Sequence, residues 1–104
     1  MTKVSRLKLG STQKAKIIDR LWEALSLKNK DEIQEFWGRI LTPTEITMFA
    51  KRVEVLKQVN RGLSYSEIRG KLKVTDNTIN KMSNVIHRVG DAFLKILLRL
   101  DKDQ

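Results

Sequence analysis

Helix-breaking residues are few in this sequence, and their scarcity constrains the fold more than any other feature. Pro43 is the single proline among 104 residues. The five glycines are Gly10, Gly38, Gly62, Gly70 and Gly90. Between these breaks, apolar residues recur at the three- and four-residue spacing of one helix face, as in the run from Ile18 to Leu25. The sequence therefore predicts an all-α fold of about six helices.

Side chains suited to capping mark where three of these helices begin. Thr42-Pro43-Thr44-Glu45 combines an N-cap threonine, a proline at the first helical position and a glutamate that can reach back to the cap. Ser64-Tyr65-Ser66-Glu67 is a second capping box, and Thr75 followed by Asp76 marks a third start. Because these signals are local, they predict the three starts closely.

The remaining helices have weaker start signals. The first helix is expected between Thr12 and Lys28, with Ser11 or Thr12 as its N-cap. A second, short helix is expected to begin near Asp31 and Glu32, whose charges complement the helix dipole. The last helix is expected to begin at Gly90-Asp91.

The composition is strongly basic and poor in catalytic side chains. Lysine and arginine number 21 against 12 acidic residues, which gives a formal net charge of +9 and a pI near 10.1. That balance favours a polyanionic partner. The chain has no cysteine and one histidine, which excludes thiolate chemistry and most His-based metal sites and catalytic triads. We expect neither an enzyme nor a metal or other cofactor.

The stretch from Ile68 to Ile79 has the apolar spacing of two short helices that meet at a steep angle. Ile68 and Leu72 are placed to hold the first helix on the core. Val74 would fill the corner, and Ile79 would anchor the second helix from beneath. The pattern predicts a helix-turn-helix over about residues 64–87.

Two positions depart from the commonest form of this motif. Arg69 follows Ile68 where alanine is usual, and Lys73 stands where the turn often has glycine. The turn is therefore expected to be looser or differently shaped.

Short amides, hydroxyls and cations gather on this motif, and such groups bind base edges and phosphates in a major groove. From Arg61 to Arg88, six cations stand against two anions, a local net charge of +4. Asn77 and Asn80 are suited to read adenine in bidentate fashion. The residues expected to contact DNA are Ser64, Tyr65, Arg69, Lys71, Lys73, Thr75, Asp76, Asn77, Thr78, Asn80, Lys81 and Asn84.

An ordered series of motifs from roughly Leu21 to the C-terminus resembles the Trp repressor superfamily. The series comprises Leu41-Thr42-Pro43, Arg52-Val53, Arg61-Gly62, Ser64 to Ile68 and Thr78-Ile79. The wider frame is closest to the YerC-like, Trp repressor-related branch, through Leu25 to Lys28, Glu32, Phe36, Glu45-Ile46, Ala50 to Val55 and Gly90-Asp91-Ala92. The resemblance implies an intertwined all-helical homodimer that binds operator-like double-stranded DNA through its paired second helices.

The resemblance also bears on a small-molecule effector. Thr42 and Arg52 match pocket positions of the tryptophan-responsive members, and Lys81 is placed to pair with a carboxylate. Where those members have Arg-Gly and then a serine three residues beyond the glycine, this chain has Lys81-Met82 and Val85. The bulky Met82 replaces the glycine that makes space for a ring, so tryptophan as corepressor is disfavoured.

These observations lead to one interpretation and two alternatives. We expect a basic flexible arm over residues 1–11 and a single helical DNA-binding domain over 12–104, which acts as a transcriptional regulator, in particular a repressor. Because the sequence has no secretory leader and no long apolar run, we expect a bacterial cytoplasmic, nucleoid-associated protein without membrane contact. The alternatives are a basic helical interaction module that binds an acidic protein, and one that binds RNA.

Overall fold

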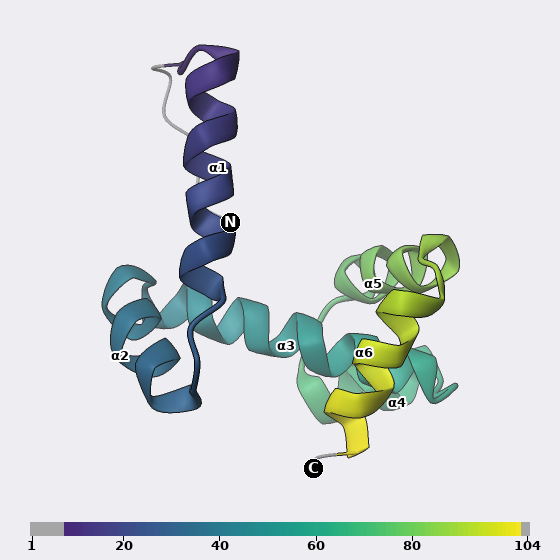
Figure 1. Ribbon diagram of the computed structural model, residues 1–104. Helices are drawn as coiled ribbons and strands as arrows, with labels where there is room; N and C mark the ends of the chain where they lie inside the picture. The colour runs from purple at the N-terminus through teal and green to yellow at the C-terminus, as the bar shows by residue number, and fades with distance from the viewer. Residues whose placement is uncertain (1–7, 103–104) are drawn as a thin grey trace. The chain divides into compact units, whose positions relative to one another are not determined.

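The computed structural model describes residues 8–102, and this part of the chain contains helices and no strand (Figure 1). Of the expected arm over residues 1–11, residues 1–7 lie outside the described part. The six helices confirm the all-α prediction. They are α1 (Ser11–Leu25), α2 (Lys30–Ile40), α3 (Pro43–Asn60), α4 (Tyr65–Leu72), α5 (Asp76–Arg88) and α6 (Asp91–Lys102).

The chain forms two compact units, Met1–Ile46 and Thr47–Gln104. The first unit contains α1, α2 and the beginning of α3, and the second contains the rest of α3 with α4, α5 and α6. Across residues 8–102, no helix has the length and apolar character that crossing a membrane requires.

The N-terminus of α1 differs from the prediction. Gly10 holds the N-cap position with extended backbone angles, and Ser11 is already helical. The choice of Ser11 or Thr12 as N-cap was wrong because a glycine is also tolerated at an exposed N-cap, where water can satisfy the first amides. No side chain caps this helix.

The C-terminus of α1 also lies earlier than predicted, since the helix ends at Leu25 rather than near Lys28. The Ser26 hydroxyl donates to the Trp22 carbonyl at 2.8 Å. Asn29 then adopts an extended conformation, and its side chain accepts a hydrogen bond of 2.9 Å from the Glu32 amide. Because Asn29 has to leave the helical region to cap α2, α1 cannot run on into it.

The two capping boxes form as the sequence predicts. At the start of α3, the Thr42 amide donates to Glu45 at 2.8 Å, and the Thr42 hydroxyl accepts from the Glu45 amide at 3.1 Å. At the start of α4, Ser64 and Glu67 make the same reciprocal pair, with both distances at 3.2 Å. Gly62, with φ of 85°, supplies the left-handed residue that separates α3 from α4.

The second unit holds a small apolar core. Val55 of α3, Ile68 of α4 and Ile79 of α5 are fully buried and form one cluster. The partly buried residues packed against it are Val59, Leu63, Leu72, Val74 and Met82. In α6, Leu97 is also buried. Burial of one such side chain contributes about 1.5–3 kcal/mol, so these few residues carry much of the stability of this unit.

Among the described residues, far more large apolar side chains are exposed than buried. Neither α1 nor α2 contains a buried residue. The exposed large apolar side chains are Leu9, Ile17, Ile18, Leu21, Trp22, Leu25, Ile33, Phe36, Ile40, Ile46, Phe49, Val53, Tyr65, Ile96, Leu98 and Leu100. Soluble monomers rarely leave this much apolar surface in contact with water.

Candidate nucleic-acid interface

The helices α4 and α5 pack around a shared apolar centre and form the predicted helix-turn-helix (Figure 1). Ile68 and Ile79 are both fully buried, one from each helix. Leu72 at the end of α4 and Val74 in the turn are partly buried against them. These are the four positions that the sequence predicts as apolar anchors, and all four are buried or partly buried.

The face of α5 opposite Ile79 is polar and exposed. Asn77, Lys81 and Asn84 are spaced four and three residues apart, so they share one face of the helix. All three are exposed, and within residues 8–102 their side chains have no hydrogen-bond or ion-pair partner. We define Asn77, Lys81 and Asn84 as the outer stripe. Its donors and acceptors are available to a ligand without the loss of an internal contact.

A second set of predicted DNA-contacting residues lies between the two helices instead. The Tyr65 hydroxyl of α4 donates to the Asn80 Oδ1 of α5 at 2.7 Å. The Arg69 Nη1 of α4 donates to the Asp76 Oδ1 of α5 at 2.5 Å. We call these two contacts the α4–α5 seam. Tyr65 and Arg69 are one turn apart on α4, and Asp76 and Asn80 are one turn apart on α5. The two contacts of the seam therefore lie side by side, one helical turn apart.

The turn between α4 and α5 is built on a left-handed residue. Lys73 has φ of 54° and ψ of 51°, and its amide donates to the Arg69 carbonyl at 2.9 Å to close α4. A lysine there takes the role that glycine fills more readily, so the expected departure from the commonest turn is a strained backbone rather than an open loop. The Lys51 ammonium of α3 donates to the Lys73 carbonyl at 3.2 Å and holds the turn against α3.

Three predicted contact residues are partly committed to capping. The Ser64 hydroxyl caps α4, and the Thr75 hydroxyl accepts from the Thr78 amide at 3.4 Å to cap α5. Thr78 is partly buried, while Ser64 and Thr75 are exposed. The Ser64 hydroxyl also donates to the Glu67 carboxylate at 3.0 Å, so its proton is already used, and the Thr75 and Thr78 hydroxyls lie 3.4 Å apart within hydrogen-bond reach of each other.

The two anions of the motif, Glu67 and Asp76, are both held by contacts within the helix-turn-helix. Hydrogen bonds from the Ser64 backbone amide, and then from its hydroxyl, hold the pKa of Glu67 below its ordinary value. Asp76 is paired with Arg69. In contrast, Lys71, Lys73 and Lys81 are exposed and belong to no ion pair of the described residues. The motif therefore presents a net positive surface.

The residues predicted for an effector pocket are divided between the two units. Thr42 belongs to the first unit, where it caps α3, and Arg52 and Lys81 belong to the second. Met82 packs against the core of Val55, Ile68 and Ile79. A groove of the first unit contains none of these residues, since its lining is Leu27, Asp31, Glu32, Glu35, Phe36, Arg39 and Ile40.

Sequence reasoning missed one functional contact and one constraint. Lys51 was not singled out, because its contact with the Lys73 carbonyl joins residues 22 positions apart and no local signal predicts it. Asn80 was taken as free to read bases, whereas its oxygen already accepts from Tyr65. No group of His, Cys, Asp and Glu among the residues that the structure describes could hold a metal ion.

Comparison with known proteins agrees with this architecture. Residues 16–101 match the family model described as Trp repressor protein. YerC, an uncharacterized protein of Bacillus subtilis (strain 168), is 27% identical over 92 residues, which is 88% of each chain. A crystal structure from Staphylococcus aureus, of a protein provisionally designated a Trp repressor, superposes with a TM-score of 0.74 at 26% identity. That match covers 89% of this chain and 96% of the other.

The family match spans nearly the whole of the part described, including the helix-turn-helix and the helices on either side of it. The structural match has the same all-helical architecture. Sequence pattern, fold and comparison therefore lead to one assignment, and the chain belongs to the Trp repressor protein family.

Proposed function

We propose that this protein is a sequence-specific DNA-binding transcriptional regulator that inserts α5 into the major groove. One observation carries the proposal: the outer stripe of Asn77, Lys81 and Asn84 lies opposite the buried Ile79. Because the apolar anchor fixes the orientation of α5, the amides and the ammonium point away from the protein with their hydrogen-bonding groups unused. Amide and ammonium side chains are the groups that read base edges in a major groove.

Phosphate binding beside the groove falls to the exposed cations of the motif. Lys71 lies near the end of α4, and Lys73 lies in the turn that leads into α5. Thr75, which begins α5, adds a hydroxyl, and the N-terminus of α5 favours an anion. The formal charge of +9 supports this function at long range, since it steers the chain toward a polyanion.

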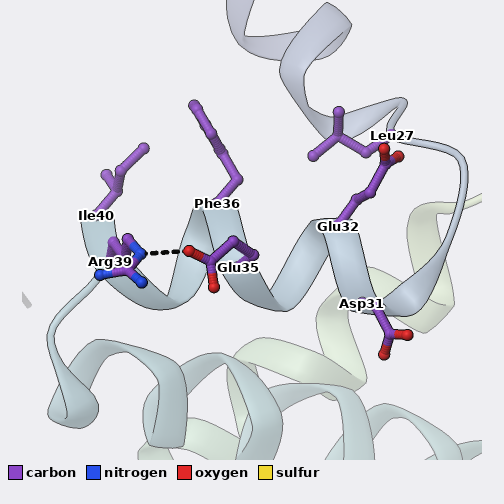
Figure 2. A pocket seen from close by; sticks show the side chains of 7 residues that line it. All are labelled: Leu27, Asp31, Glu32, Glu35, Phe36, Arg39 and Ile40. Atoms are coloured by element: carbon purple, nitrogen blue, oxygen red, sulfur yellow. Dashed lines mark hydrogen bonds and ion pairs between the residues drawn. The ribbon is translucent and has the colours of Figure 1, made fainter.

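The active form is a homodimer whose two α5 helices read two half-sites. The exposed apolar faces of α1, α2 and α3 support this proposal, because one copy leaves them in water. Figure 2 shows Phe36 and Ile40 projecting from the same side of α2, with Leu27 on the preceding loop. A second copy offers equally apolar helices to cover them. In this arrangement residues 12–104 form one DNA-binding domain in each subunit.

Promoter occupancy is the simplest way for such a protein to act, so we propose a repressor working on the bacterial nucleoid in the cytoplasm. Tryptophan is not proposed as a corepressor. Met82 occupies part of the core, and Lys81-Met82 replaces the Arg-Gly pair of the tryptophan-responsive members. Regulation by occupancy alone requires no effector.

The decisive experiment is selection of bound sequences from a random duplex library at physiological salt, with the mass of the protein measured in the same buffer. The expected result is a two-fold symmetric motif together with a dimeric mass. Binding without an enriched motif, which falls away as salt rises, would contradict the proposal and indicate a nonspecific electrostatic binder. Preference for an acidic protein or for RNA over every duplex would favour the alternatives.

A further inference from the structure

One contact of the α4–α5 seam, between Tyr65 and Asn80, fixes the orientation of the Asn80 side-chain amide on α5. The Tyr65 hydroxyl donates to the Asn80 Oδ1 at 2.7 Å, and both residues are exposed. A phenolic O–H is a good donor and an amide oxygen is a good acceptor, so this direction of the hydrogen bond is chemically favoured. The oxygen of Asn80 is thereby held toward α4, and its Nδ2 donors are left to face outward.

We infer that Tyr65 determines the base preference of Asn80, an inference that rests on the proposed function. Bidentate reading of adenine requires the amide oxygen and nitrogen to face the same base edge, with the oxygen accepting from N6 and the nitrogen donating to N7. Tyr65 occupies one lone pair of the Asn80 oxygen and holds that oxygen toward α4, so the groups of Asn80 that face away from α4 are its Nδ2 donors. Guanine offers two adjacent acceptors, O6 and N7, so Asn80 selects guanine rather than adenine.

Asn77 provides an internal comparison on the same helix. It lies three residues before Asn80, is exposed, and has no side-chain partner within the described residues 8–102. Both of its amide atoms are therefore free to meet one base edge. Asn77 keeps the preference for adenine that the residue type alone predicts, and the two asparagines read different bases.

The other contact of the seam, between Arg69 and Asp76, is expected to keep α4 and α5 in place when the contact between Tyr65 and Asn80 is removed. Arg69 and Asp76 pair at 2.5 Å between the same two helices, Ile68 and Ile79 are fully buried, and none of these contacts involves the Tyr65 hydroxyl. Tyr65→Phe retains the ring and deletes only the hydroxyl. The variant is therefore expected to fold as the wild type does and to release the oxygen of Asn80 alone.

The test compares the wild type with Tyr65→Phe, Asn80→Ala and Asn77→Ala by selection from a random duplex library. Asn80→Ala identifies the half-site position that Asn80 reads, because the preference at that position is lost. In Tyr65→Phe, the ratio of adenine to guanine at that position is expected to rise at least about fivefold, the lower end of what one base contact discriminates. Asn77→Ala identifies, in the same way, the half-site position that Asn77 reads. The base preference at that position is expected to stay unchanged in Tyr65→Phe.

Three outcomes would overturn the inference. An unchanged base preference in Tyr65→Phe would show that the hydroxyl does not direct Asn80. A uniform loss of affinity for all sequences would make Tyr65 a phosphate contact instead. No enriched motif for the wild type would remove the proposed function itself, and with it this inference. Independently of DNA, the side-chain amide resonances of Asn80 in the free protein are expected to shift in Tyr65→Phe, and those of Asn77 are not.

Discussion

The guanidinium of Arg61 chelates the carboxylate of Asp101, with Nε donating to Oδ2 at 2.9 Å and Nη2 donating to Oδ1. Arg61 follows α3, and Asp101 lies near the end of α6, so the contact joins residues 40 positions apart. The hydrogen bond from Arg61 is the main cause that lowers the pKa of Asp101, and the same bond raises the pKa of Arg61. Within the second unit, the pair therefore joins the end of α6 to the segment that follows α3.

This pair predicts an acid-sensitive contribution to stability. Because the pKa of Asp101 is lower in the folded than in the unfolded chain, its contribution is present above the unfolded value, about 3.9 for aspartate. The contribution is lost as the pH falls from there through the folded value. Urea unfolding of the wild type and Asp101→Asn is expected to differ at neutral pH and to converge as the pH falls below the lowered pKa of Asp101. A difference in stability that persists in acid would contradict the assignment.

The core of the helix-turn-helix predicts a large effect from one truncation. Ile79 is fully buried against Val55 and Ile68, so Ile79→Ala removes apolar contacts and leaves a cavity. The expected loss in the free energy of unfolding is about 2–5 kcal/mol, measured by urea titration. The matched control Ile79→Val is expected to cost about 0.5–1.5 kcal/mol. Equal effects of the two variants would show that the site collapses around the missing atoms.

Much of the fold could be predicted because the signals at helix starts are local. Thr42 with Glu45, and Ser64 with Glu67, each bond across three residues, and the structure contains both pairs. The start of α1 was misplaced for the same reason, since Gly10 carries no side chain that could announce a cap. A helix start can be predicted from the local sequence where a side chain caps it. It cannot be predicted in this way where the capping residue has no side chain.

The candidate site could be predicted only in part, because its polar contacts depend on how two helices cross. The periodicity of α5 placed Asn77 and Lys81 opposite Ile79, and a helical wheel is enough for that. The pairing of Tyr65 with Asn80 spans 15 positions and requires the angle between α4 and α5, which the sequence does not specify. Periodicity therefore predicted which residues share the exposed face of α5, but it could not separate the free groups of that face from the paired ones.

The turn of the motif predicts a variant that is more stable and binds DNA less tightly. Lys73 has φ of 54°, which costs a lysine roughly 1 kcal/mol more than a glycine. Lys73→Gly is expected to raise the free energy of unfolding by up to about 1 kcal/mol, reduced by the extra freedom of glycine in the unfolded chain. Loss of the cation is expected to weaken binding to all duplexes alike. A destabilised Lys73→Gly variant would show that the side chain makes a contact that outweighs the strain.

The exposed apolar face of α3 predicts that one charged substitution on it weakens dimerisation. Phe49 and Val53 lie one turn apart, and both are exposed in one copy. Phe49→Asp would place an unpaired carboxylate in the proposed dimer interface, where burial of a charge is costly. Sedimentation analysis is expected to show at least a tenfold weaker dimer, about 1.4 kcal/mol. Thr44→Asp, at an exposed position in the first turn of the same helix, is the control and is expected to dimerise normally.

The division of α5 and its neighbours into base-reading and phosphate-binding groups predicts two distinct kinds of DNA-binding defect. Asn77→Ala is expected to cost about 1–3 kcal/mol on the selected site and almost nothing on unrelated duplexes, so discrimination falls. Lys71→Ala is expected to weaken binding to every duplex and to make the dependence of log K on log salt shallower by about one unit. Titrations of both variants on the selected site and on a scrambled one, at two or more salt concentrations, separate these effects. If Asn77→Ala weakened the two duplexes equally, the residue would contact the backbone, and α5 would not lie in the groove with its outer stripe against the bases.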